Sequence, residues 1–75
     1  MSIADFMIHL DSEIPLHERT QLESEIGKKD GVVSVCFSPG HLHIMAITYN
    51  PDVISSDELL AHVSQRGIVA QKVGL

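Results

Sequence analysis

The sequence predicts an α+β sandwich of the ferredoxin-like type, a four-stranded antiparallel sheet with two helices on one face. Three observations lead to it: strand periodicity in residues 3 to 10 and 41 to 49, helical spacing in two other segments, and a hairpin turn at Ser38-Pro39-Gly40. The chain has 75 residues, and we expect residues 1 to 75 to form a single domain with a thin core. The expected element order is β-α-β-β-α-β.

The first half of the chain predicts a strand, a helix and a strand. Residues 3 to 10 alternate, and one face carries the apolar set Phe6, Ile8 and Leu10. Leu22 and Ile26 stand four apart in a polar stretch, so we expect a helix over residues 15 to 29, with Pro15 at its first position. The β-branched run of residues 32 to 37 favours a strand.

The second half predicts a strand, a helix and a short strand. Residues 41 to 49 complete the hairpin, with Met45, Ile47 and Tyr49 on the core side. Ser55 and Glu58 form a capping box, in which each side chain reaches the other residue's amide, and Gly67 ends the helix. Residues 68 to 73 suit a fourth strand. Right-handed crossovers then bring loop 11 to 18, the hairpin turn and Gly67 to one end of the domain.

Composition and charge argue against several classes of function. The net charge of −5, with only five Lys and Arg, leaves no basic patch for nucleic-acid binding. The N-terminal apolar run is broken by Asp5, His9 and Asp11, so neither a signal sequence nor a membrane span is expected. A single Cys is compatible with a cytoplasmic location. No nucleophile and base pattern and no Gly-rich phosphate loop are present, so an enzyme is not expected.

Three stretches of the sequence carry a family resemblance: Gly31-Val32 with Val35 and Phe37, then Ala46-Ile47-Thr48-Tyr49-Asn50-Pro51-Asp52, then Ser55 with Asp57-Glu58-Leu59-Leu60 and Gly67. In these the chain resembles the heavy-metal-associated domain family of copper chaperones, mercury-binding proteins and N-terminal modules of metal-pumping ATPases. The resemblance implies a metal loop at residues 11 to 18. The family's two cysteines fall at Pro15 and Glu18 and its loop Met at Glu13, so thiolate-based copper transfer is not expected.

Histidines offer a different kind of metal site. His41 and His43 are two apart, so a strand would project both from one face. Together with the loop they would supply nitrogen and oxygen ligands for zinc, nickel or divalent copper. The candidate metal ligands are His17, His41, His43, Asp11, Glu13 and Glu18. Ordinary surface histidines explain the same pattern, and His62 is expected to face solvent on the second helix.

The sheet face opposite the predicted core is unusually apolar. Its members, a candidate interface for a protein partner or a second copy, are Met7, Cys36, Leu42, Ile44 and Ala46. Cys36 is expected to be a small buried hydrophobe, and a register error of one residue would exchange the two faces. Two functions therefore stay open. One is a heavy-metal-associated-like domain that binds a divalent metal ion, and the other is a degenerate, metal-independent module for protein interaction or self-association.

Overall fold

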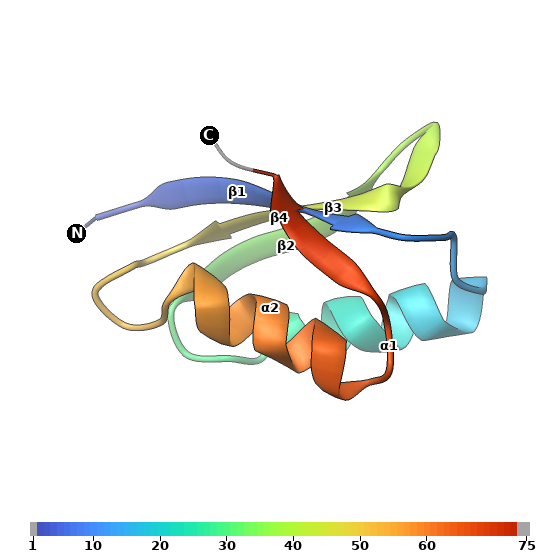
Figure 1. Ribbon diagram of the computed structural model, residues 1–75. Coiled ribbons are helices and arrows are strands. Elements are labelled where there is room, and N and C mark those ends of the chain that lie inside the picture. Colours follow the sequence, from blue (N-terminus) through green and yellow to red (C-terminus); the bar gives the residue numbers. More distant parts are fainter. Residues whose placement is uncertain (1, 74–75) are drawn as a thin grey trace.

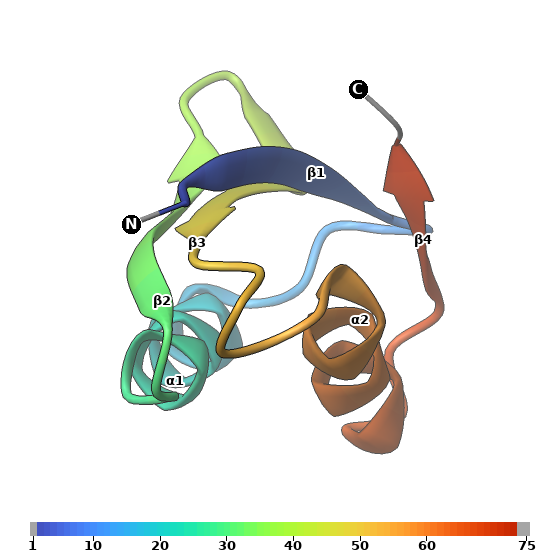
Figure 2. The same ribbon diagram turned by 90° about the vertical axis from the view of Figure 1, so that its left-hand side faces the viewer.

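The computed structural model describes residues 2 to 73 and contains the six elements in the predicted order (Figure 1). They are β1 (Ala4–Leu10), α1 (Leu16–Gly27), β2 (Val32–Ser38), β3 (His41–Tyr49), α2 (Ser56–Gln65) and β4 (Ala70–Val73). The strands form one antiparallel sheet in the order β2-β3-β1-β4. Both helices lie on the same side of this sheet (Figure 2). The predicted ferredoxin-like fold class is confirmed.

The register between β1 and β3 decides which side chains form the core. Phe6 pairs with Ile47 and Ile8 with Met45, while the intervening Met7 pairs with Ala46 on the other face. The fully buried side chains come from both helices and the two central strands: Ile8, Leu10, Leu22, Ile26, Met45, Ile47, Leu59 and Val63. The predicted core face is therefore the face beneath the helices, and the alternative with exchanged faces is wrong.

Helix α1 begins one residue later than predicted. Pro15 is the N-cap, with an extended backbone at φ −59° and ψ 154°, and its carbonyl accepts hydrogen bonds from the amides of Glu18 and Arg19 at 3.0 Å. Proline fits this position because an N-cap needs no helical backbone angle and its carbonyl starts the helical hydrogen bonds. Leu22 and Ile26 are buried, so the narrow apolar stripe of this helix is confirmed.

Helix α2 begins at the predicted cap. The Ser55 hydroxyl accepts a hydrogen bond from the Glu58 amide at 3.1 Å, whereas the Glu58 carboxylate lies 3.5 Å from the Ser55 hydroxyl instead of bonding to its amide. Ile54 and Leu59 are buried on either side of this cap, as in a hydrophobic staple. Gly67 follows the helix with φ +81°, and β4 starts at Ala70, two residues later than expected.

The three connections expected at one end of the domain do meet there. The Asp11 amide donates to the Val69 carbonyl at 2.8 Å, which fastens the loop after β1 to the segment before β4. The tip of the β2–β3 hairpin lies at the same end (Figure 1). Neither helix of the described residues is long and apolar enough to cross a membrane.

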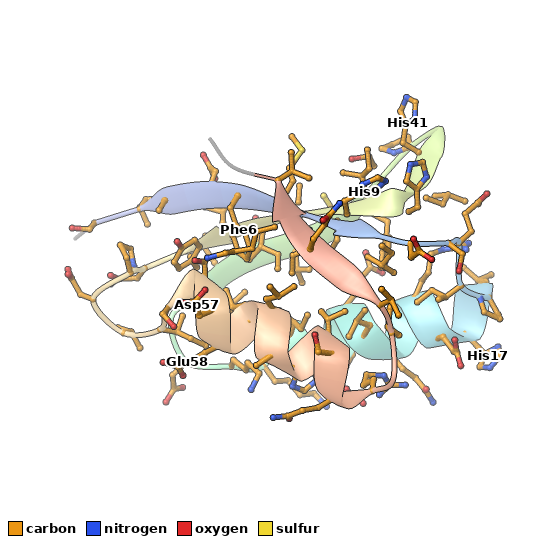
Figure 3. All side chains as sticks on the ribbon, in the orientation of Figure 1. Phe6, His9, His17, His41, Asp57 and Glu58 are labelled. Atoms are coloured by element: carbon orange, nitrogen blue, oxygen red, sulfur yellow. The ribbon has the colours of Figure 1, made fainter. Side chains whose placement is uncertain are left out.

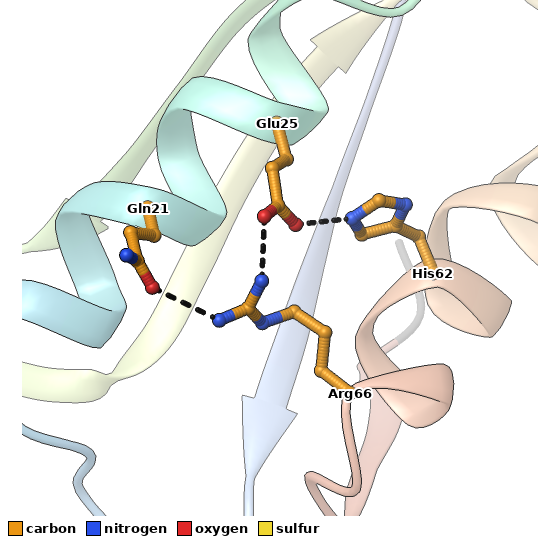
Figure 4. A network of polar contacts seen from close by, with 4 residues as sticks. All are labelled: Gln21, Glu25, His62 and Arg66. Carbon is orange, nitrogen blue, oxygen red and sulfur yellow. Dashed lines mark hydrogen bonds and ion pairs between the residues drawn. The ribbon is translucent and has the colours of Figure 1, made fainter.

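A polar network joins the two helices on the side away from the sheet (Figure 4). The Glu25 carboxylate contacts the His62 ring at 2.8 Å and accepts from the Arg66 guanidinium at 2.6 Å, and Arg66 also donates to Gln21 at 3.2 Å. The expectation of a solvent-facing His62 is wrong, because its side chain is only 23% exposed. The His62 ring reaches Glu25 because α1 and α2 lie side by side. The helical periodicity within α2 does not show which element packs beside it.

This network predicts a specific dependence of stability on pH. The His62 ring, followed by the Arg66 guanidinium, holds the pKa of Glu25 below its ordinary value. A carboxylate with a lowered folded-state pKa stabilises the fold above its unfolded pKa, and this contribution is lost as the pH falls through the folded pKa. We therefore expect Glu25→Gln to be less stable than the wild type at pH 7, by an amount that shrinks below about pH 4.

Urea unfolding at a series of pH values measures this difference, with Glu13→Gln, which removes an exposed loop carboxylate, as the control. The control should follow the wild-type curve. An unchanged stability difference for Glu25→Gln from pH 7 to pH 3 would show that the helix-to-helix contacts do not depend on the charge of this carboxylate.

Candidate functional site

The loop between β1 and α1 carries no ligand for a soft metal ion. Pro15 caps the helix and has no donor side chain, while Glu13 is exposed before the helix and Glu18 lies in its first turn. The chain's one cysteine, Cys36, lies on β2 and not in this loop. Soft ions such as monovalent copper prefer thiolate ligands. The donor groups present at this loop therefore do not fit a thiolate metal centre.

Protein contacts hold this loop in place. The Arg19 guanidinium donates to the Ile14 carbonyl at 2.6 Å, and the Ile14 side chain packs partly buried against the core. With the Asp11 amide bonded to Val69, the loop is fixed at both of its ends. Its conformation thus depends on hydrogen bonding and packing that need no bound ion.

Imidazoles gather instead at the end of the sheet near the hairpin. The rings of His9 and His43 have centroids 4.9 Å apart and are tilted by 50°, and the ring of His41 lies 6.2 Å from that of His43. His9 and His41 both lie on the side of the sheet that the helices leave uncovered (Figure 3). We call His9, His41 and His43 the histidine cluster.

An irregular register in the hairpin explains why His43 meets His9. Phe37 pairs with Met45, but the next residue of β2, Ser38, pairs with His41. An advance of one residue along β2 therefore corresponds to four residues along β3. The additional length of β3 interrupts the regular alternation near the turn. His9 lies between the buried Ile8 and Leu10 and thus points away from the core. The ring of His43, which strict alternation puts on the core side, lies beside it.

The structure brings together only part of the predicted ligand set. His41 and His43 lie near each other as expected, but His17 lies in the first turn of α1, in the helix layer and well apart from His41 (Figure 3). Asp11 lines a shallow hollow of about 160 Å³ together with His9 and Gln71. Within residues 2 to 73, no three His, Cys, Asp or Glu side chains are grouped closely enough to hold a metal ion as they stand.

His9 is not among the ligands predicted from the sequence, although the alternation in its strand already indicates that it faces outward. His9 is an outward-facing residue on the strand that pairs with β3, directly opposite Ile44 and next to His43. The alternation of residues 3 to 10 gives the outward direction of His9. Its contact with His43 depends on the hairpin irregularity, and alternation alone does not reveal that irregularity.

Four of the five predicted interface residues, Met7, Cys36, Ile44 and Ala46, lie on the uncovered face of the sheet. Cys36 and Met7 both pair with Ala46, one from each neighbouring strand, so the three residues are adjacent. Met7 is 37% exposed, and Ile44, Leu42 and Ala46 are half-buried. The expectation of a buried thiol is wrong, because Cys36 is exposed. No helix covers this face, so an outward side chain on β2 stays in contact with solvent.

No protein-family model matches the sequence, and no curated protein gives a significant match. Solved structures are nevertheless similar in fold. Oxidised MerP from Ralstonia metallidurans CH34 superimposes with a TM-score of 0.80 at 13% identity, over 95% of this chain and 97% of that chain. A putative copper-ion-binding protein from Bacillus anthracis str. Ames gives 0.82 at 16% identity, over 93% of this chain and 97% of that chain.

The N-terminal domain of the zinc(II) ATPase ziaa, in its apo form, is also similar, with a TM-score of 0.76 at 13% identity over 99% of this chain and 73% of that domain's chain. The chain therefore shares its fold with these three proteins. In this chain the shared fold has a β1–α1 loop that lacks cysteine and a histidine cluster on the uncovered face of the sheet.

Proposed function

We propose that this domain binds a divalent transition-metal ion, such as zinc, nickel or divalent copper, through imidazole and carboxylate groups. The observation that carries the proposal is the gathering of three of the chain's five histidines at one end of the sheet, where rings from β1 and β3 lie in contact. Imidazole is a good ligand for these three ions, whereas monovalent copper prefers sulfur. The net charge of −5 also favours a cation as the ligand.

The fold of the similar structures supports the same class of ligand. Two of them are described as a putative copper-ion-binding protein and as part of a zinc(II) ATPase. In the present chain the β1–α1 loop offers carboxylates and no thiol, so metal handling here needs harder ligands. The proposed cargo is therefore a divalent ion that is held by nitrogen and oxygen atoms and not by sulfur.

Titration of the purified domain with zinc, nickel and divalent copper salts tests the proposal. We expect one ion per chain, an affinity tighter than roughly micromolar for divalent copper, and weaker binding of nickel and zinc, in line with the usual order of stability for these ions. Binding should weaken at acid pH, because a protonated imidazole cannot coordinate a metal. Calorimetry gives the affinity and stoichiometry, and backbone amide shifts show where the ion binds.

A second candidate function is metal-independent protein interaction through the uncovered face of the sheet. The exposed apolar side chains of Met7 and Val73, which pair across β1 and β4, favour it. The same titration separates the two functions. Weak shifts scattered over all the histidines, or no shifts at all, would exclude metal binding and leave protein interaction as the function.

A further inference from the structure

We propose that the metal ion is held on the uncovered side of the sheet by His9 and His43, with His41 as the third ligand, and not at the β1–α1 loop. This inference rests on the proposed function, since it names the ligands and the location of the ion. It also moves the ion from the helix layer, where His17 lies, to the opposite side of the sheet.

The distance between the first two rings fits a shared ion. With zinc–nitrogen distances of about 2.0–2.1 Å and a tetrahedral angle, the centroids of two imidazoles on one ion lie about 5 Å apart. The centroids of the His9 and His43 rings are 4.9 Å apart. They come from neighbouring strands at the end of a paired segment, so the sheet itself maintains their spacing. The spacing of these two rings therefore matches that of two imidazoles on one ion.

The third ligand needs only a local adjustment. The rings of His41 and His43 are 6.2 Å apart, more than a tetrahedral ion requires, and this gap accords with the absence of a ready three-ligand group in the described residues. His41 is exposed beside the hairpin turn, so its side chain can change rotamer without disturbing the core. Rotation toward His43 completes a three-imidazole set.

The remaining coordination position is open to water or to an exchangeable ligand. His9 also borders the shallow hollow that it shares with Asp11 and Gln71. A carboxylate near a ligand histidine commonly orients the ring or binds the ion's water. A three-imidazole site that leaves a fourth position open is accessible for uptake and release of the ion, as a cargo site requires.

Single histidine replacements test the location directly, with zinc, nickel and divalent copper salts as the probes. We expect His9→Gln and His43→Gln each to weaken binding by about tenfold or more, because even loss of a group that only orients a ligand costs that much. His41→Gln should weaken it less. His17→Gln, the matched control from the helix layer, should leave the affinity unchanged, and melting curves without metal should show that all four variants fold.

Imidazole proton resonances of the wild-type domain give a second measurement that needs no variant. Addition of zinc should shift the ring signals of His9, His41 and His43 and leave those of His17 and His62 in place. If the ion binds but His17→Gln or Glu18→Gln weakens it while His9→Gln does not, the inference is overturned and the proposed function stands. If no ion binds to the wild type, both are wrong.

Discussion

Replacing Ile8 by alanine is expected to lower the free energy of unfolding by about 2–5 kcal/mol. Ile8 is fully buried in a central strand and packs in the core between the sheet and the helices. Removing three methyl or methylene groups there loses their burial and leaves a cavity that the surroundings fill only in part. In a domain of this size the loss is a large share of the total stability. Urea unfolding monitored by circular dichroism measures it.

The neighbouring Met7→Ala variant is the matched control. Met7 lies on the same strand, but its side chain is on the uncovered face and is 37% exposed. We expect its replacement to change stability by less than about 1 kcal/mol, since little new cavity forms. Equal losses for the two variants would mean that the uncovered face is also packed in solution, and would therefore point to an interface there.

Replacing Gly31 by alanine is expected to destabilise the domain by two separate mechanisms. Gly31 has φ +92°, a backbone conformation that costs a residue with a side chain about 1–2 kcal/mol. A Cβ atom there would also lie 2.8 Å from Cβ of Val53 and 3.1 Å from Cγ2 of Ile54, and such overpacking costs about 1–3 kcal/mol more. The Gly31 carbonyl accepts from the Asn50 amide, so a shift would also disturb that connection.

Gly67→Ala separates the two mechanisms. Gly67 has a similar φ of +81°, but a Cβ atom there would meet nothing within 4 Å. It should therefore show only the backbone cost of about 1–2 kcal/mol. Urea midpoints at an unchanged m-value compare the two variants. If Gly31→Ala is no less stable than Gly67→Ala, Val53 moves aside freely and the close approach at Gly31 contributes nothing.

The histidine cluster does not lie where the family resemblance implies a metal site. The resemblance implies a metal loop in residues 11 to 18, and the structure holds that loop with the Arg19 to Ile14 hydrogen bond and packing of Ile14. Imidazoles meet on the other side of the sheet. The imidazole groups of this chain therefore gather at a different surface from the loop that the resemblance implies.

Most elements were predictable because each depends on residues close together in the chain. The Ser55 cap needs only Glu58 three residues later, and the stripe of α1 needs only Leu22 and Ile26 four apart. The alternation of residues 3 to 10 likewise gives the buried and outward faces of β1 without knowledge of its neighbours. The predicted ends of α1 differ from the observed ends by one or two residues, and Pro15 is the N-cap instead of the first helical residue.

The amino-acid sequence by itself determined the element order, the residues that share each face of a strand and the lack of cysteine in the β1–α1 loop, because periodicity, capping and residue identity act locally. Only the tertiary structure decided that His43 lies beside His9, that His62 bonds to Glu25 and that Cys36 is exposed. Each of these depends on which elements become neighbours and on the register between them. A single irregularity between Phe37 and Ser38 was enough to bring together histidines that alternation assigns to opposite faces.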